Sequence, residues 1–77
     1  MDIDNDKIDD TVLALLQLTL HENNRAWKGM DWDVLARLHE RGFIDDPVNK
    51  NKSVVLTKEG AERSQALFLE LFSKKPV

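Results

Sequence analysis

The absence of cysteine from a chain of only 77 residues is the feature that most limits what this sequence can fold into. A domain of this size buries a small share of its surface, and chains near this length often depend on a disulfide, a metal or a second copy. Without cysteine, neither a disulfide nor a thiolate metal site can form. We therefore expect one small domain over residues 1–77, with a second copy as the remaining source of buried apolar surface.

Three segments carry the sequence signals of helices: residues 4–21, 32–41 and 58–73. Asp4, Asp31 and Thr57 stand where each helix begins, and their side-chain oxygens can accept hydrogen bonds from free backbone N–H groups of the first turn. Gly42 follows the second segment, at the position where a left-handed residue commonly ends a helix. These signals predict a mainly helical chain.

Strand signals lie between these helices. Phe43-Ile44 and the β-branched run Ser53–Thr57 predict a hairpin, with Pro47 and the polar residues 49–52 in its loop. Ala26-Trp27-Lys28 is expected to add a short strand to it. The expected fold is therefore mainly α with a β-hairpin, in the order helix, short strand, helix, β-hairpin, helix.

A short helix that ends in glycine, then Phe-Ile, a charged hairpin and Val-x-Leu-Thr-x-x-Gly before a helix, form a distinctive pattern. Its residues are Leu38, Gly42, Ile44, Val54, Leu56, Thr57 and Gly60. From about residue 32 to 72 the pattern resembles the second half of winged-helix proteins of the multiple-antibiotic-resistance regulator type. That resemblance implies a winged-helix-like fold, with the helix before Gly42 as recognition helix and the hairpin as wing. Only nine residues separate Ile44 from Val54, so this wing is short.

A second set of motifs runs along nearly the whole chain. It comprises Ala26-Trp27-Lys28-Gly29, Asp31-Trp32-Asp33, Leu38-His39-Glu40, Asp46-Pro47-Val48, Lys52-Ser53-Val54 and Leu56-Thr57. These motifs resemble a family of short, uncharacterised bacterial proteins. Because that family has no assigned activity, the resemblance implies no functional residues.

The chain offers few groups for catalysis or metal binding. His21 and His39 are too few for a metal site without help from carboxylates. The Asp pairs at positions 9/10, 31/33 and 45/46 stand at helix starts or in a turn, where capping and solvation explain them. No nucleophile with a partnering base and no glycine-rich phosphate loop is present. We therefore expect that the protein is not an enzyme and that it binds neither a metal nor a cofactor.

Trp27 and Trp32 flank Lys28-Gly29-Met30-Asp31 and allow two interpretations. They could form an exposed aromatic platform for a partner or a nucleic-acid base. They could instead close the core beside the connector, since large aromatic side chains dominate small cores. The second interpretation is preferred at this point.

Basic residues could form a nucleic-acid-binding face. The candidates are Lys28, Arg37, Arg41, Lys50 and Lys52. In a winged helix the recognition helix and the wing both approach DNA. However, Asp33 and Glu40 beside Arg37 would repel a duplex, and the net charge is −3. Nucleic-acid binding is therefore possible but not favoured.

Apolar residues exceed what one core face needs. In the first helix Ile8, Val12, Leu15 and Leu16 follow one helical stripe, and other apolar side chains lie off the stripes of their elements. The candidates for a dimer interface are Leu13, Leu18, Leu20, Val55 and Leu69. Such an excess in a small domain predicts a homodimer through the first and last helices.

The sequence thus predicts a non-catalytic protein-interaction module that acts as a homodimer, with an unknown protein partner. The alternative is a small winged-helix DNA-binding transcriptional regulator. The acidic start shows no secretory signal, and the longest apolar-rich stretch, residues 12–20, is too short to span a bilayer. We expect a cytoplasmic protein without a membrane partner.

Overall fold

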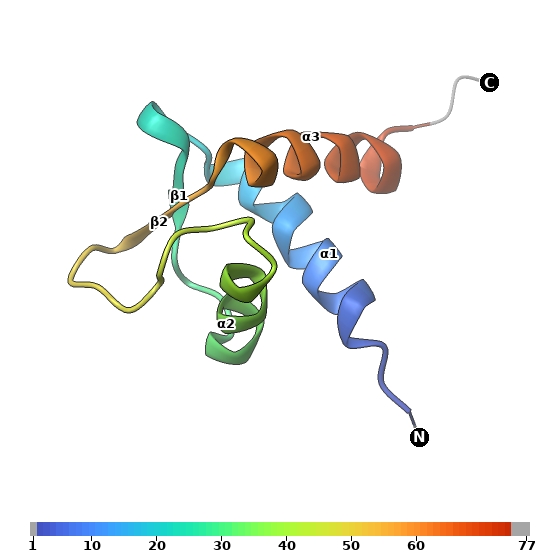
Figure 1. Ribbon diagram of the computed structural model, residues 1–77. Coiled ribbons are helices and arrows are strands. Elements are labelled where there is room, and N and C mark those ends of the chain that lie inside the picture. The colour runs from blue at the N-terminus through green and yellow to red at the C-terminus, as the bar shows by residue number, and fades with distance from the viewer. Residues whose placement is uncertain (1, 75–77) are drawn as a thin grey trace.

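The computed structural model describes residues 2–74 (Figure 1). Its elements in chain order are α1 (Asn5–Leu15), the 3₁₀ turns η1 (Leu16–Thr19) and η2 (Glu22–Asn24), β1 (Arg25–Trp27), α2 (Trp32–Glu40), β2 (Ser53–Val55) and α3 (Lys58–Phe72). The expected order of helix, short strand, helix, β-hairpin and helix is confirmed. Within the described residues, no helix is both long enough and apolar enough to cross a membrane.

Local side-chain chemistry sets the helix ends, as the sequence predicts. Asp4 accepts from the backbone N–H of Lys7, and Asp31 accepts from the N–H groups of the first turn of α2. Thr57 accepts from the N–H of Gly60 at the start of α3. Gly42 has a φ of 81° and ends α2 in the left-handed region that glycine adopts at low cost.

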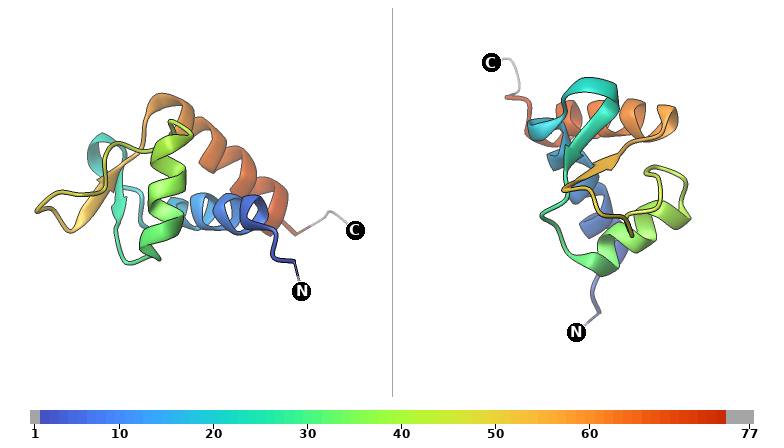
Figure 2. Two further views of the ribbon diagram at one scale, coloured as in Figure 1. Left: turned by 60° about the horizontal axis from the view of Figure 1, so that its bottom comes forward. Right: turned by 90° about the vertical axis from the view of Figure 1, so that its left-hand side faces the viewer.

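The small sheet joins segments on either side of α2. β1 pairs antiparallel with β2, with Ala26 opposite Val54, and the expected strand at Phe43-Ile44 is reduced to a single bridge between Ile44 and Leu56. Residues 45–52 form the hairpin loop, which projects from the body beside β1 and β2 (Figure 2). Figures 1 and 2 place this loop at the opposite end of the molecule from the start of α1 and the end of α3.

Both α2 and α3 pack on α1, and the α1–α3 contact is the more extensive. The buried apolar residues are Leu13, Ala14, Leu16, Ala26, Val34, Leu35, Leu38, Ile44, Val54, Leu56 and Leu67. The buried Ser64 hydroxyl joins the two long helices by donating to the Leu13 carbonyl at 2.6 Å. The core therefore fills the space that the three helices and the sheet enclose.

The face of α1 that enters this core differs from the expected one. Leu13 is fully buried within a single chain, so its assignment to a dimer interface is wrong. Ile8, expected on the core stripe, is exposed, while Asp9 is fully buried. The physical reason is the pairing of Asp9 with a cation of α2, which lets a carboxylate occupy a core position and rotates the buried face of α1 toward Leu13.

The first helix also ends earlier than expected. Regular α1 stops at Leu15, and η1 carries the chain to Thr19. The turn back to β1 passes through Asn23 and Asn24, both at positive φ (59° and 58°), which asparagine tolerates better than most residues. This turn places β1 alongside η1.

Candidate functional site

Trp27 and Trp32 are both exposed, at 62% and 58% of their surface. The preferred interpretation of these residues as core closers is therefore wrong. Side chains alternate along a strand, and in β1 it is Ala26 that faces inward, which turns Trp27 outward. Trp32 is the first residue of α2, whose core face is formed by Val34, Leu35 and Leu38.

The two tryptophans stand on anchored backbone. The Trp27 N–H donates to the Thr19 hydroxyl at 2.9 Å, which ties the end of β1 to η1. Trp32 directly follows Asp31, whose carboxylate accepts from the N–H groups of Asp33 and Val34. Regular elements therefore fix the backbone of both aromatic residues, and side chains held in this way bind a partner at a smaller cost in conformational entropy.

Lys28 lies between them and holds the hairpin loop. Its ammonium nitrogen donates to the carbonyl and side-chain oxygens of Asn49, both at 3.1 Å, and to the Asn51 carbonyl at 3.2 Å. The same nitrogen lies 5.4 Å from the centre of the Trp32 ring, within range of a cation–π interaction. An ammonium group has three N–H donors, so these three oxygens use all of them.

These residues line a shallow depression of about 410 Å³. Its lining comprises Trp27, Lys28, Gly29, Trp32, Asn49, Asn51 and Lys52, which we call the tryptophan surface. A smaller hollow of about 250 Å³ adjoins it, lined by His21, Trp27, Lys52 and Ser53. Trp27 and Lys52 border both, so the hollowed area continues past Trp27.

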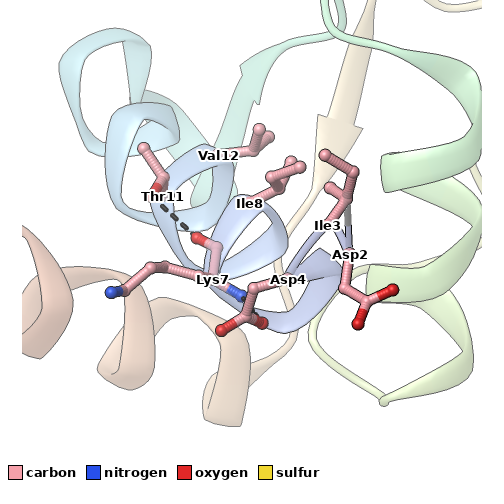
Figure 3. Close-up of a pocket in the computed structure, with 7 residues that line it drawn as sticks. All are labelled: Asp2, Ile3, Asp4, Lys7, Ile8, Thr11 and Val12. Atoms are coloured by element: carbon pink, nitrogen blue, oxygen red, sulfur yellow. Dashed lines mark hydrogen bonds between the residues drawn. The ribbon is translucent and has the colours of Figure 1, made fainter.

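A third hollow of about 340 Å³ runs along the start of α1. Figure 3 shows Ile3, Ile8 and Val12 on one side of it, while Lys7 points away. All of its lining comes from residues 2–12, and it holds no group that α2, α3 or the sheet contributes. The tryptophan surface joins three separate segments and is the stronger candidate site.

The predicted basic face is divided between two places. Arg37 makes a bidentate contact with buried Asp9, with both N···O distances at 2.7 Å, and Arg41 lies 3.4 Å from Asp10. The hydrogen bond to Asp9 raises the pKa of Arg37 above its ordinary value, and the charges of Asp9, Asp33 and Asp31 add to this effect. Both arginines therefore serve to hold α2 on α1.

The lysines of the predicted face either lie in the hairpin loop or form hydrogen bonds to it. Lys28 is half-buried and spends its donors on Asn49 and Asn51. Lys50 and Lys52 are exposed. The structure thus brings Lys28 and Lys52 together on the tryptophan surface. Sequence analysis could not find these hydrogen bonds of Lys28, because no local signal links it to Asn49 and Asn51, which lie 21 and 23 positions later in the chain.

The remaining dimer candidates fall into two groups. Leu18 and Leu69 are exposed, at 68% and 56%, while Leu20 and Val55 are partly buried within the chain. Further exposed apolar side chains are Ile3, Ile8, Val48, Leu71 and Phe72. Leu69, Leu71 and Phe72 lie at the end of α3, so exposed apolar surface gathers in the last two turns of that helix.

The chain resembles known sequences over nearly its full length. It is 65% identical over 74 residues to the uncharacterized protein y4hR of Sinorhizobium fredii (strain NBRC 101917 / NGR234). The aligned region covers 96% of this chain and all of that protein. No solved structure matches the chain, and the winged-helix resemblance stays a prediction.

The expected membership of a family without assigned activity is confirmed by a match to residues 4–74, which is most of the chain. The protein belongs to the family described as Domain of unknown function (DUF6429).

Proposed function

We propose that this protein is a non-catalytic protein-interaction module that binds its partner through the tryptophan surface. The observation that carries the proposal is that Trp27 and Trp32 are both exposed and line one depression. Lys28, which also lines it, is hydrogen-bonded to the hairpin loop. Tryptophan is the residue type most enriched among side chains that dominate binding energy, because it buries a large apolar area with few rotatable bonds.

The charge arrangement supports a protein partner over duplex DNA. A duplex-binding helix would need free cations on its outer face, but Arg37 and Arg41 of this region pair with Asp9 and Asp10. The exposed side of α2 also carries Asp33 and Glu40. The net charge of −3 adds no general attraction to phosphates.

The proposal predicts that losing both indoles weakens partner binding without unfolding the protein. The test starts with affinity capture from the source organism, identification of the captured protein and its separate purification. Titration calorimetry then compares the full chain with the double variant Trp27→Ala/Trp32→Ala. We expect a loss of at least tenfold in affinity, because truncating a central tryptophan costs about 2 kcal/mol or more.

Ile3→Ala is the matched control, since Ile3 is equally exposed but lies at the start of the chain, ahead of α1. Its affinity should equal that of the unaltered chain. Equal affinity for the partner in the double tryptophan variant would contradict the proposal. So would the failure of any captured protein to bind once both components are pure.

We also propose that the module is a homodimer, which the exposed apolar side chains at the end of α3 support. Leu69, Leu71 and Phe72 are each close to half exposed, and Phe72 packs edge-on against Phe68 with ring centres 5.6 Å apart. The end of α3 lies away from the hairpin loop (Figure 2), so self-association there would leave the tryptophan surface free.

Replacing Leu69 with glutamate is therefore expected to separate the copies. Sedimentation equilibrium at tens of micromolar should give the mass of a dimer for the unaltered chain and of a monomer for Leu69→Glu. The fold should survive, because Leu69 is exposed and the substitution breaks no core contact. A monomer in the unaltered chain at this concentration would refute the dimer.

A further inference from the structure

We propose that the tryptophan surface binds an extended, proline-rich segment of a partner protein with an acidic residue beside its prolines. This inference rests on the proposed function and specifies its ligand. The shape of the site is the first argument. The depression is shallow and open, and its apolar part consists of two indoles with Gly29 between them in sequence. Aromatic-lined surfaces of this kind accept proline rings, which lie flat on them.

The hydrogen-bonding groups that remain free on the surface are mostly donors. Within residues 2–74, neither indole N–H donates to a protein acceptor. The side-chain oxygen of Asn49 already accepts from Lys28 and from the Asn51 N–H, and its amide nitrogen donates to the Asp46 carbonyl. Among the side chains of the surface, what is left are the two indole N–H groups, the Lys52 ammonium and the Asn51 side-chain amide, which can both donate and accept.

A ligand that fits the tryptophan surface must offer hydrogen-bond acceptors and have few donors that need an acceptor from the protein. Proline has no backbone N–H, and a polyproline II segment exposes all of its carbonyl oxygens. Addition of a β-strand is disfavoured at this place, because the outward N–H of Trp27 is taken by Thr19 and the Arg25 carbonyl accepts from His21. An extended segment without strand pairing is the ligand class that matches.

The charges on the loop side specify the acidic residue. Lys50 and Lys52 are exposed there, and Lys28 adds a third cation beneath them. The carboxylates beside Trp32 in sequence are Asp31, which spends one oxygen on two N–H groups of α2, and the exposed Asp33, and neither lines the depression. A ligand carboxylate near Lys52 would therefore meet a local positive charge in a chain that is acidic as a whole.

The chain contains its own reporter for this ligand. It has two tryptophans and both line the surface, so intrinsic fluorescence reports on the surroundings of these two indoles. The full chain is titrated with a peptide of about eight prolines followed by two or three glutamates. Two comparison ligands are the same peptide with alanine for proline, and an oligonucleotide of about ten thymidines, since indoles and lysines can also bind single strands.

We expect a saturable blue shift with the proline peptide, with a Kd on the order of 100 µM, and no saturable shift with the alanine peptide. Lys52→Glu should weaken binding of the acidic peptide several-fold and leave an uncharged proline peptide unaffected. Lys58→Glu is the matched control, because Lys58 is an exposed lysine at the start of α3, outside the tryptophan surface.

Three results would overturn the inference: no saturation with the proline peptide at millimolar concentration, equal binding of the alanine peptide, or tighter and salt-dependent binding of the oligonucleotide. These results are distinguishable from failure of the proposed function. A captured partner whose binding still requires Trp27 and Trp32 would keep the interaction module and discard only the proline-rich ligand.

Discussion

Replacing Gly60 with alanine is expected to unfold the protein or to lower its melting temperature by more than about 12 °C. A Cβ at this position would lie 1.7 Å from the carbonyl oxygen of Phe43 and 2.6 Å from its carbonyl carbon. Both are backbone atoms and cannot move aside as a flexible side chain would. The α3 helix must therefore shift or the chain between α2 and β2 must open.

Either shift is costly, because Thr57 at the start of α3 is hydrogen-bonded to the backbone of residues 42 and 43. The Thr57 N–H donates to the Phe43 carbonyl at 3.0 Å, and the Thr57 hydroxyl donates to the Gly42 carbonyl at 2.7 Å. That hydroxyl also accepts from the Gly60 N–H and caps α3. Moving α3 away would break the cap and the bonds to residues 42 and 43. We expect a loss of about 3 kcal/mol or more.

Gly29→Ala is the control for Gly60→Ala. Apart from Gly29 itself and its two neighbours in the chain, no heavy atom of the described residues lies within 4 Å of a Cβ at this position, and its backbone is not in the left-handed region. Thermal melts followed by circular dichroism should place Gly29→Ala within a few degrees of the unaltered chain. A Gly60→Ala variant that melts equally close would show that α3 does not approach Phe43 as the structure has it.

Replacing Arg37 with alanine should have the second-largest effect. Asp9 has no exposed surface, and both of its carboxylate oxygens bind Arg37 at 2.7 Å. Without Arg37, a charged group would remain in the core without its partner, which is among the most destabilising changes known for a buried ion pair. We expect the melting temperature to fall by about 10 °C or more.

Two comparisons isolate the effect of this pair. Arg63→Ala removes a half-exposed arginine whose contact with Asp10 is 4.0 Å long, so it should change the melting temperature by about 2 °C or less. The double variant Asp9→Ala/Arg37→Ala should lose less stability than the two single variants added together, since neither charge is left alone. Additive losses would mean that Asp9 and Arg37 do not depend on each other.

The parts of the fold that could be predicted are those fixed by neighbouring residues. Asp4, Asp31 and Thr57 cap their helices with contacts two or three residues away, and Gly42 ends α2 through its own backbone. Such signals lie within one turn and are readable in sequence. The short strand expected at residues 26–28 beside the later hairpin is present at residues 25–27, where it pairs antiparallel with β2.

What could not be predicted depends on partners distant in the chain. Asp9 enters the core only because Arg37, 28 positions later, neutralises it, and this pairing turns the helix so that Leu13 is buried and Ile8 exposed. The same pairing withdraws Arg37 from the predicted basic face. Periodicity alone could not show either effect, since it assigns carboxylates to the solvent side.

The tryptophan surface could likewise be predicted only in part. Trp27 and Trp32 were recognised as a pair with two possible roles, but the choice between them depends on which side of β1 faces the core. Ala26 takes the inward position of β1, opposite Val54 and within the buried apolar cluster. The exposure of both indoles follows from this packing.

The most direct test of a binding role for the tryptophan surface is the nuclear magnetic resonance of its two indole N–H groups. The chain has two tryptophans, so a ¹⁵N-labelled sample gives two indole signals. Both signals are predicted to shift when the purified partner is added, in step with the bound fraction. Two unmoved indole signals, while backbone signals elsewhere in the chain shift on binding, would contradict this account.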